Sequence, residues 1–314
     1  MRPAIASRST ALAAVLLALS ACAAPRAAKE PWPSAAPSAA RKAFLWEVTR
    51  ADAPDRPLYL TGSIHAGRPG QFTFPPAFER AIGRAEALVV EVDPRKAEGP
   101  GLQRLALQVG LYQPPDSLSA HLDDKTRALL PAALERVGLT PQAVDGVRPW
   151  MLAATLGVME LQRAGYDAKG GVDALLLARF HAPKEIVELE TAEAQVRLLA
   201  GLPEALQVLM LRDSLGSGAT TALSLAQIAS AWEGGNPNAL ASTVFEHASD
   251  AELAPMYQAV FFDRNVTMTD KLAALAGAPK VHLAVVGAGH LVGEQGILAL
   301  LAARGLQVRQ LEWE

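Results

Sequence analysis

Short apolar runs lie near both ends of the chain, and they predict the strands of a sheet. Each run is bounded by Gly, Pro or charged residues, which is typical of strands. The run ALVVEVD is continuous rather than alternating, as expected for a strand buried on both faces. A Pro/Asp turn joins the first two runs into a predicted hairpin. The predicted strands are residues 44–48, 58–65, 87–93, 184–190, 280–286 and 306–312.

Between about residues 100 and 278 the apolar residues have helical spacing almost throughout. One predicted helix starts at an Asp cap, at residue 123, and stops at Gly138. Another begins with Pro149 in its first turn and ends at Gly165. Only the strand at 184–190 interrupts this helical region.

The two ends of the chain share one arrangement of elements. Strand, Gly-x-x-His, helix and strand occur in residues 58–92 and again in residues 281–312. In the second unit the loop GAGH is followed by a predicted helix over residues 291–305. The C-terminal strands are too few to form a sheet alone, so both ends are expected to build a single sheet. We therefore predict an α/β fold over residues 43–314, with a central mixed sheet and a large helical insertion.

The first 21 residues resemble a bacterial lipoprotein signal peptide. Arg2 and Arg8 precede an apolar run, residues 11–19, that is too short to span a bilayer. The run closes in LSAC, which looks like a lipobox and implies lipidation of Cys22. An ordinary cleaved signal with a chance cysteine is the alternative.

The segment after the cysteine is predicted to tether the domain to a membrane. Residues 22–42 are rich in Pro, Ala and Ser and have no apolar periodicity. In bacterial lipoproteins a residue other than Asp after the lipidated cysteine, here Ala23, implies sorting to the outer membrane. The expected location is therefore the periplasmic face of the outer membrane.

Composition and charge limit the classes of partner. Half of the 314 residues are hydrophobic, and the formal net charge is −3. No basic run is interleaved with aromatic residues, so neither a nucleic acid nor an anionic membrane surface is expected as partner. Because Cys22 is the only cysteine, disulfides and cysteine catalysis are not expected in the folded domain.

Two Gly-x-x-His turns carry the candidate chemistry. Gly62 precedes His65 at the end of one predicted strand, and Gly287 precedes His290 at the end of another. Ligands of parallel sheets collect beyond the carboxyl ends of strands, so both histidines can share one site with Glu91. Two histidines and a carboxylate suit a divalent metal such as Mn, Co, Zn or Fe. Without a metal, the same groups suit general acid–base chemistry. For each histidine alone, a structural role is the alternative.

The second turn also resembles a dinucleotide fingerprint. GAGHLVG matches G-x-G-x-x-x-G between a strand and a helix, and Glu312 ends the next strand. The chain stops at residue 314, so no further unit completes the nucleotide-binding half. We therefore expect no dinucleotide cofactor.

Six segments together resemble the TraB/GumN family, which is related to the Tiki proteins. They match in order over about residues 44–312: YLTGSIHAG, LVVEVD, RPWMLAATL, GGVDALLLARFHAPKEIVELETAEAQ, FDRNVTMTDKLAAL and VVGAGHLVGEQGILALLAARGLQVRQL. The resemblance implies a fold akin to erythromycin esterase and ChaN-type haem-binding proteins. For the Tiki branch it further implies metal-dependent proteolysis with two histidines and an acidic residue in the active centre.

Carried over to this sequence, the implied metal ligands and catalytic residues are His65, Glu91 and His290. The resemblance also suggests that Arg264 points into the crevice, where it can hold a carboxylate or a substrate carbonyl. Asn265 follows it as a supporting residue. Glu190 is either a second acidic residue of the site or a strand-end carboxylate facing water.

The expected function is that of a metal-dependent, metallopeptidase-like hydrolase of the cell envelope. Its substrates would be peptides or proteins of the periplasm. A non-catalytic lipoprotein that binds metal or haem in the same crevice is one alternative, and an adaptor of an envelope or conjugation system is another.

Overall fold

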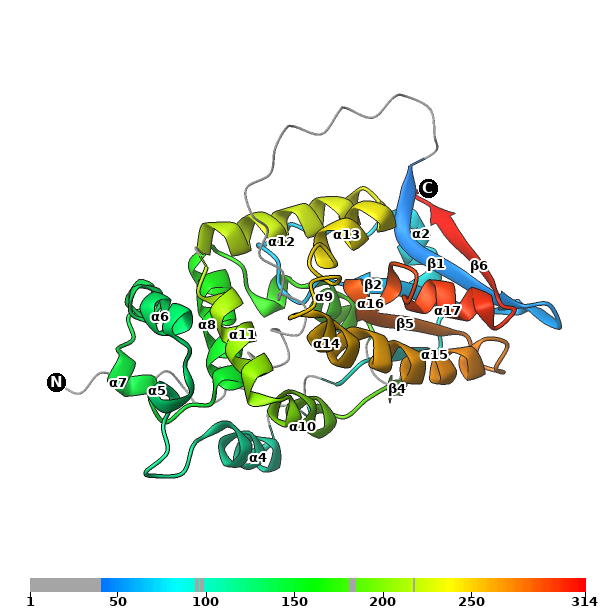
Figure 1. The fold of residues 1–314 in the computed structure, drawn as a ribbon. Coiled ribbons are helices and arrows are strands. Elements are labelled where there is room, and N and C mark those ends of the chain that lie inside the picture. Colours follow the sequence, from blue (N-terminus) through cyan, green and yellow to red (C-terminus); the bar gives the residue numbers. More distant parts are fainter. Residues whose placement is uncertain (1–40, 94–95, 97–98, 181–184, 217) are drawn as a thin grey trace.

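The computed structural model describes residues 41–93, 96, 99–180, 185–216 and 218–314. The predicted signal peptide, the lipidation site at Cys22 and nearly all of the tether lie outside these residues. Within them, β-strands and helices form a mixed α/β structure (Figure 1).

A six-stranded mixed sheet forms the centre of the fold. Its strand order is β4-β3-β5-β2-β1-β6, in which β2, β5, β3 and β4 are parallel and β1 is antiparallel to β2 and β6. The N-terminal strand therefore lies between β2 and the C-terminal strand, as the blue and red arrows in Figure 1 show. This confirms a sheet built from both ends of the chain. The strands are β1 (Lys42–Arg50), β2 (Ala53–Ser63), β3 (Ala87–Val90), β4 (Glu185–Glu188), β5 (His282–Gly287) and β6 (Gln307–Glu312).

Helices make up most of the chain between β3 and β5, as predicted. The π-helical segment Gln258–Phe262 joins α14 to α15, and a short 3-10 turn, Ala168–Gly170, precedes α9. The α-helices are α2 (Pro76–Arg84), α4 (Pro100–Gly110), α5 (Leu118–His121), α6 (Asp124–Arg136), α7 (Pro141–Val144), α8 (Pro149–Arg163), α9 (Val172–Arg179), α10 (Ala192–Gly201), α11 (Glu204–Ser214), α12 (Gly218–Glu233), α13 (Pro237–Val244), α14 (Ala254–Tyr257), α15 (Asp263–Leu275), α16 (Ala288–Leu291) and α17 (Ile297–Ala303).

Local signals explain where the helices of the insertion begin and end. The Asp123 side chain caps α6 by accepting a hydrogen bond from the amide of Thr126 at 2.8 Å. Pro149 occupies the first turn of α8, where its missing N–H costs no helical hydrogen bond. Gly138 and Gly165, which follow α6 and α8, have φ angles of 73° and 82°, a conformation that favours glycine.

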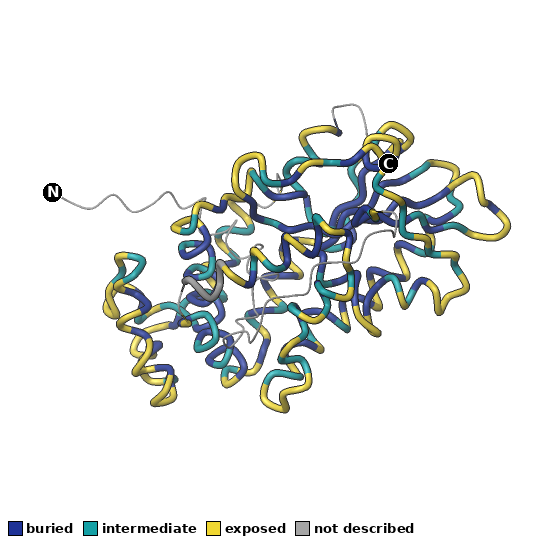
Figure 2. Tube along the Cα trace, turned by 90° about the horizontal axis from the view of Figure 1, so that it is seen from above, coloured by how far each residue is buried: buried dark blue, intermediate teal, exposed yellow. Residues whose placement is uncertain are grey.

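Two large hydrophobic cores and a small third cluster stabilise the described part of the chain. The larger one surrounds the sheet, in which β3 and β5 are buried along their whole length and are therefore dark blue in Figure 2. The second large core lies among helices of the insertion, where Leu118, Leu134, Leu156 and Leu211 are buried. The insertion therefore has apolar packing of its own. It also contributes side chains of α8 and α12 to the larger core around the sheet.

The C-terminal Gly-x-x-His segment differs from the prediction of a loop followed by one helix. Residues 288–291 form the short helix α16 directly after β5, and the chain then leaves the helix before α17 begins at Ile297. The break falls at Gly293, which has a φ of 84°. The predicted continuous helix over residues 291–305 was therefore wrong, because the glycines at 293 and 296 interrupt it.

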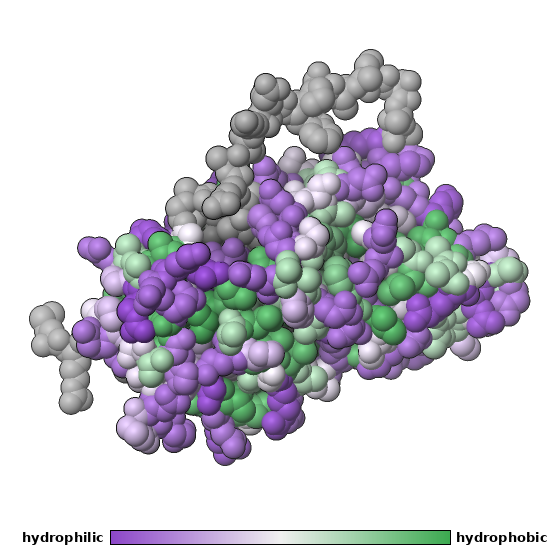
Figure 3. Space-filling view, viewed as in Figure 1, coloured by the Kyte–Doolittle hydropathy of each residue, from purple (hydrophilic) through white to green (hydrophobic). Residues whose placement is uncertain are grey.

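Polar residues dominate the face of the molecule seen in Figure 3, and apolar residues form small groups between them. In the part of the chain that the structure describes, no helix combines the length and apolar character needed to cross a bilayer.

Candidate active site

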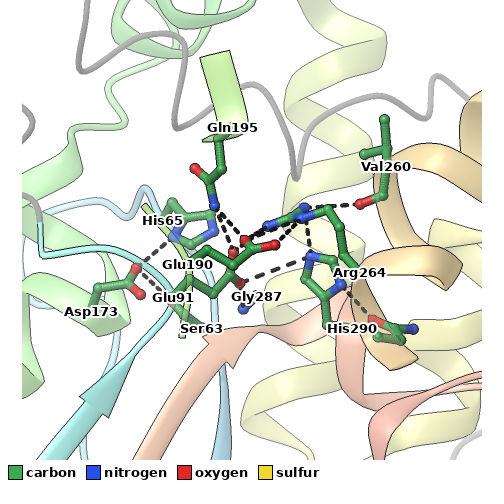
Figure 4. Close-up of polar contacts among 11 residues, drawn as sticks. Ser63, His65, Glu91, Asp173, Glu190, Gln195, Val260, Arg264, Gly287 and His290 are labelled. Atoms are coloured by element: carbon green, nitrogen blue, oxygen red, sulfur yellow. Dashed lines mark hydrogen bonds and ion pairs between the residues drawn. The ribbon is translucent and has the colours of Figure 1, made fainter. Parts of the chain in front are cut away.

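Four parallel strands end at one edge of the sheet, and a predicted site residue follows each of them. Across the sheet, Glu190 follows β4, Glu91 follows β3, His290 follows β5 and His65 follows β2. Figure 4 shows these side chains turned toward a common centre, with Arg264 reaching in from α15. The edge beyond the carboxyl ends of parallel strands is the usual ligand position in α/β folds. The fold thus brings all five residues together.

Gly287 leaves open the space between three of these side chains. A Cβ atom there would lie 3.1 Å from Glu91 Oε1, 3.3 Å from His290 Cδ2 and 3.4 Å from His65 Nε2. The amide of Gly287 also donates a hydrogen bond to Glu91 Oε1. The absent side chain therefore makes room at the point where the two histidines and the carboxylate meet.

Gly62 allows close packing of neighbouring residues, whereas Gly287 leaves space open in the centre. A Cβ atom at this position would lie 2.6 Å from the Phe44 ring and 2.8 Å from the backbone of Ala288. Its carbonyl accepts a hydrogen bond of 2.7 Å from the indole of Trp232. The glycine lets α16 approach β2 closely, which brings the second motif next to the first.

The two Gly-x-x-His motifs have the same spacing but different backbones. In the pairing of β2 with β5, Gly62 lies opposite Val286, and Gly287 lies opposite Ser63, one residue later. The first motif continues beyond its strand as an irregular segment, whereas the second turns into α16. The histidines therefore reach the same centre along different routes, and their side chains are not related by a simple repeat.

Asp173, in the first turn of α9, orients His65. Its Oδ2 atom lies 2.7 Å from His65 Nδ1 and also accepts a hydrogen bond from the hydroxyl of Ser63. A carboxylate can only accept, so His65 Nδ1 carries a proton and Nε2 faces the centre. Burial alone would lower the pKa of His65, but Asp173 and Glu91 outweigh it and raise that pKa to about 9.

Asn265 orients His290 in a comparable way. The Asn265 side chain donates to the carbonyl of Gln295 at 2.8 Å, which leaves its Oδ1 atom 2.6 Å from His290 Nδ1. His290 Nε2 then presents a lone pair to the guanidinium of Arg264, 3.0 Å away. Burial, followed by the positive charges of Arg264 and His65, lowers the pKa of His290 to about 3 despite Glu91. His290 is therefore a neutral imidazole.

Arg264 holds two buried carboxylates. Its Nη2 atom lies 2.8 Å from Glu91 Oε2 and 2.6 Å from Glu190 Oε2, and its Nε atom donates to Glu190 Oε1 at 3.0 Å. Gln195 adds a bond of 2.9 Å to Glu190 and a weaker one of 3.3 Å to Glu91. The side chain of Glu190 is only 14% exposed, so the alternative of a carboxylate facing water does not hold.

These contacts determine which groups are charged. Burial opposes ionisation of Glu91, but the charges of Arg264 and His65, together with the hydrogen bond from the Gly287 amide, hold its pKa below the ordinary value. Burial likewise disfavours the charge on Arg264, yet Glu91 and Glu190 raise its pKa above the ordinary value. At neutral pH the centre thus contains a protonated His65, an ionised Glu91 and a neutral His290.

A π-helical segment directs Arg264 into the centre. The segment Gln258–Phe262 ends just before Arg264, whose Nη1 atom donates to the carbonyl of Val260 at 2.9 Å. Such π-helical turns often occur at functional sites because they change the direction of the side chains that follow. Phe261 also lies against the His290 ring, with 5.1 Å between ring centroids.

The fit of a metal ion can be judged from the donor atoms. Each histidine has a partner at Nδ1 and turns Nε2 toward the centre, which is typical of metal ligands. However, Arg264 donates to His290 Nε2 and to Glu91. Its positively charged guanidinium therefore already binds two of the three predicted metal ligands. Among the described residues, no group of three His, Cys, Asp or Glu side chains is arranged to hold a metal. The arrangement of Arg264 therefore does not fit a metal held by His65, Glu91 and His290.

Comparison with known proteins gives the family. Residues 44–310 match the profile of the TraB/PrgY/gumN family. The chain belongs to the TraB/PrgY/gumN family. The proteins called "Uncharacterized protein YbaP" from Escherichia coli (strain K12) and Shigella flexneri are each 27% identical to it over 260 residues, 82% of this chain and 93% of theirs. No solved structure gives a significant match. This confirms the family that the sequence motifs indicated.

In this family member the centre opens into a narrow cleft. The cleft has a free volume of about 30 Å³, enough for a water molecule beside the polar groups. Ser63, His65, Gly287 and His290 line its polar end, and apolar side chains line the rest. The side chain of His65 remains 21% exposed, so solvent reaches it.

Two residues of the centre were missed from the sequence. Asp173 and Gln195 lie in the first turns of α9 and α10, where an acidic or polar residue is usual for helix capping alone. The local sequence signal was the Gly170–Gly171 pair shortly before Asp173. In the structure, the backbone of this pair packs against that of Gly67 and His65. Among the other histidines, His282 lies at the opposite end of β5, away from the centre.

Proposed function

We propose that this protein is a hydrolase in which His65 is the general acid and Glu91 the general base. The observation that carries the proposal is the geometry at Gly287, where an added Cβ atom would lie 3.1 Å from Glu91 Oε1 and 3.4 Å from His65 Nε2. Their surroundings raise the pKa of His65 to about 9 and lower the pKa of Glu91. Titratable neighbours whose pKa values are pushed apart are the usual sign of an acid–base pair.

In the proposed reaction, Glu91 Oε1 accepts a proton from a water molecule beside Gly287. The water oxygen attacks a carbonyl carbon of the substrate, and the bond to the leaving group breaks as His65 Nε2–H protonates it. Both protons are then accounted for, and the proton on Glu91 returns to His65 through water. General acid–base catalysis of this kind contributes about 10²- to 10⁴-fold to a rate.

The remaining residues position this pair. Asp173 keeps the imidazolium of His65 in one orientation. Arg264 and Gln195 hold the Oε2 atom of Glu91, so that its Oε1 atom faces the space beside Gly287. The neutral His290, fixed by Asn265 and Arg264, supplies a wall of this space rather than a charge.

The resemblance to the Tiki branch supports peptides or proteins as substrates. The LSAC ending at Cys22 supports a lipid anchor and a position on the periplasmic face of the outer membrane. The proposed pair needs no metal for charge balance, because the positive charges of Arg264 and His65 together balance the negative charges of Glu91 and Glu190. The metal-dependent form of the hydrolase remains a prediction from the sequence, and it requires Arg264 to leave His290 Nε2.

Cleavage of a mixed peptide library by the purified mature protein, followed by mass spectrometry, tests the proposal. We expect cleavage that falls by about 10²- to 10⁴-fold in His65→Ala and in Glu91→Gln, with the fold retained by circular dichroism. His247→Ala is the matched control, because this partly exposed histidine pairs with Asp250 outside the cleft. An inactive wild-type protein that binds metal or haem would favour the binding alternative.

EDTA distinguishes the two forms of the hydrolase. We expect activity to survive dialysis against the chelator. Loss of activity that Mn, Co, Zn or Fe restores would instead support the metal-dependent centre.

A further inference from the structure

A surface groove lies between helices α4 and α10, which are side by side in Figure 1. Its free volume is about 480 Å³, within the range of about 300 to 1,000 Å³ that is usual for ligand sites. Gly101 of α4 leaves part of the groove open, because a Cβ atom added there would meet no other atom within 4 Å. The groove is therefore large enough for a short segment of peptide.

Positive charge dominates this groove. Of the four described charged residues that line it, Lys96, Arg104 and Arg197 are cations and only Glu193 is an anion. Arg197 binds Glu193 at 2.8 Å, and Lys96 binds Glu188, which lies outside the lining. Arg104 is exposed and has no ion pair with any described residue. The groove therefore keeps a net positive charge even when Glu188 is counted, on a chain whose formal net charge is −3.

The uncharged part of the lining suits a peptide rather than a free inorganic anion. Leu102 and Leu105 of α4 are partly buried and, with Ala192 of α10, give the groove an apolar surface. The exposed amide of Gln108 offers both a donor and an acceptor, which a peptide main chain can use. Arginine in turn pairs with carboxylates through two parallel hydrogen bonds. A chain segment that combines acidic and aliphatic side chains therefore complements the groove.

The groove is connected to the candidate active site through α10 and through the segment after β3. Gln195 of α10 donates to Glu190 and Glu91, and Ala192, about one turn earlier, lines the groove. Lys96 follows Glu91 by five residues, and five residues of extended chain span at most about 18 Å. A peptide of about ten residues, which spans about 33 Å when extended, can therefore contact both regions.

We propose that the groove between α4 and α10 binds an acidic segment of the substrate, a few residues away from the bond that is cleaved. This inference rests on the proposed hydrolase and adds to it the substrate class: peptides or protein segments in which Asp or Glu alternates with aliphatic residues. The groove lies outside the cleft, so its binding can be measured without any cleavage. Because the charges of the groove are exposed, binding should weaken as the salt concentration rises.

Fluorescence anisotropy with labelled decapeptides and the purified mature protein tests the groove. We expect a Glu/Leu decapeptide to bind at least about 10-fold more tightly than its Lys/Leu counterpart. Arg104→Glu should weaken binding of the Glu/Leu peptide by about 10-fold, as expected for loss of an arginine from a binding surface. Arg56→Glu is the matched control, because Arg56 is also exposed and lies near the start of β2, at the opposite edge of the sheet from the candidate active site. It should change the affinity by less than about 2-fold.

A cleavage assay decides whether the acidic ligand is part of the substrate. Peptides that the protein cleaves are extended with the Glu/Leu segment or with the Lys/Leu segment. We expect the acidic extension to lower KM without changing kcat, because binding far from the reacting atoms is the same in the ground state and the transition state. Arg104→Glu should remove this gain in KM, and Arg56→Glu should not.

The two assays separate failure of the groove from failure of the hydrolase. Equal binding of the Glu/Leu and Lys/Leu peptides, or equal effects of Arg104→Glu and Arg56→Glu, would overturn the groove whether or not the protein cleaves peptides. The expected binding without an effect on KM would overturn the substrate role and assign the groove to an acidic partner. Binding without any cleavage would overturn the hydrolase and the substrate role but leave the acidic ligand. If Arg104→Glu does not fold, Arg104→Ala replaces it and should weaken binding in the same direction.

Discussion

The acid strength of His65 depends on one carboxylate that lies 108 positions away in the sequence. Asp173 fixes the proton on Nδ1 and, with Glu91, keeps the imidazolium charged at neutral pH. A histidine with an ordinary pKa near 6.5 would be mostly neutral at pH 7, so only a smaller fraction of it would be in the acid form. The charge of His65, the proposed acid, is therefore set by neighbouring carboxylates that are distant in the sequence.

This dependence predicts a pH effect. Because the pKa of His65 is raised to about 9, its acid form predominates below that pH, and activity should fall as the pH rises through about 9. Asp173→Asn should move the fall to lower pH, since the amide cannot stabilise the imidazolium. NMR titration of His65 measures the same shift without relying on activity. Asp250→Asn, at the exposed partner of His247, is the control and should leave the titration of His65 unchanged.

Arg264 is the residue on which the stability of the centre depends. It is 6% exposed and pairs with both Glu91 and Glu190. Arg264→Ala would leave these carboxylates buried without a countercharge, so we expect a loss of about 3 to 5 kcal/mol in the free energy of unfolding. Chemical denaturation measures this loss.

The matched control for Arg264 is an exposed ion pair of the same type. Arg197 pairs with Glu193 on the surface of α10, where both side chains are more than half exposed. Arg197→Ala should cost less than about 1 kcal/mol. Equal losses in the two variants would contradict the structural role assigned to Arg264.

At the scale of elements, the centre exists because four parallel strands end together. The strand order β4-β3-β5-β2 places two carboxylates and two histidines side by side, although they follow one another differently along the chain. Gly62 allows α16 to pack on β2, and Gly287 keeps the end of β5 clear of side-chain atoms. The strand ends thus supply both the reacting groups and the space between them.

Gly287→Ala tests this space. The φ of Gly287 is −50°, which alanine adopts without strain, so we expect the fold to persist. The new methyl group would press against Glu91 Oε1 and fill the position of the attacking water, which should reduce activity by about 10²-fold. Gly157→Ala, in α8 with no atom within 4 Å of the added Cβ, is the control and should keep full activity. Full activity of Gly287→Ala would mean that the reaction occurs elsewhere.

At the scale of the whole molecule, the sheet and the helical insertion close over one cleft. The proposed acid and base follow strands of the sheet, whereas several apolar side chains that line the cleft come from α8, α12 and α13. The cleft is therefore built from segments that are far apart in the sequence.

The predicted anchor concerns the whole molecule as well. If Cys22 is lipidated, the wild-type protein should fractionate with membranes, because the acyl chains partition into the bilayer. A Cys22→Ser variant should leave the membrane fraction and be recovered as soluble or unprocessed protein. Detection of both proteins by immunoblot after fractionation measures this. Wild-type protein found soluble in the periplasm would contradict the lipid anchor.

Sequence patterns were sufficient for the elements and for much of the candidate site. Strands and helices follow from local periodicity and capping, because burial of one face imposes a repeat on neighbouring residues. The two motif histidines, Glu91 and Arg264 could also be identified from the sequence as candidate site residues, because strand ends and family motifs mark them locally. Even the break between α16 and α17 had a local signal in two glycines, although the prediction missed it.

The tertiary structure alone decided which groups meet. Asp173 reaches His65, Gln195 reaches Glu190 and Glu91, and Arg264 donates to His290. Such contacts join residues that are far apart in the chain. They depend on the order of the strands and on the direction of each side chain, and a local sequence pattern contains neither. The charge states follow from those partners, because burial and neighbouring charges, and not residue type, set each pKa. The sequence by itself therefore determined which residues are available for chemistry, and the folded chain decided which of them is acid, base or neutral.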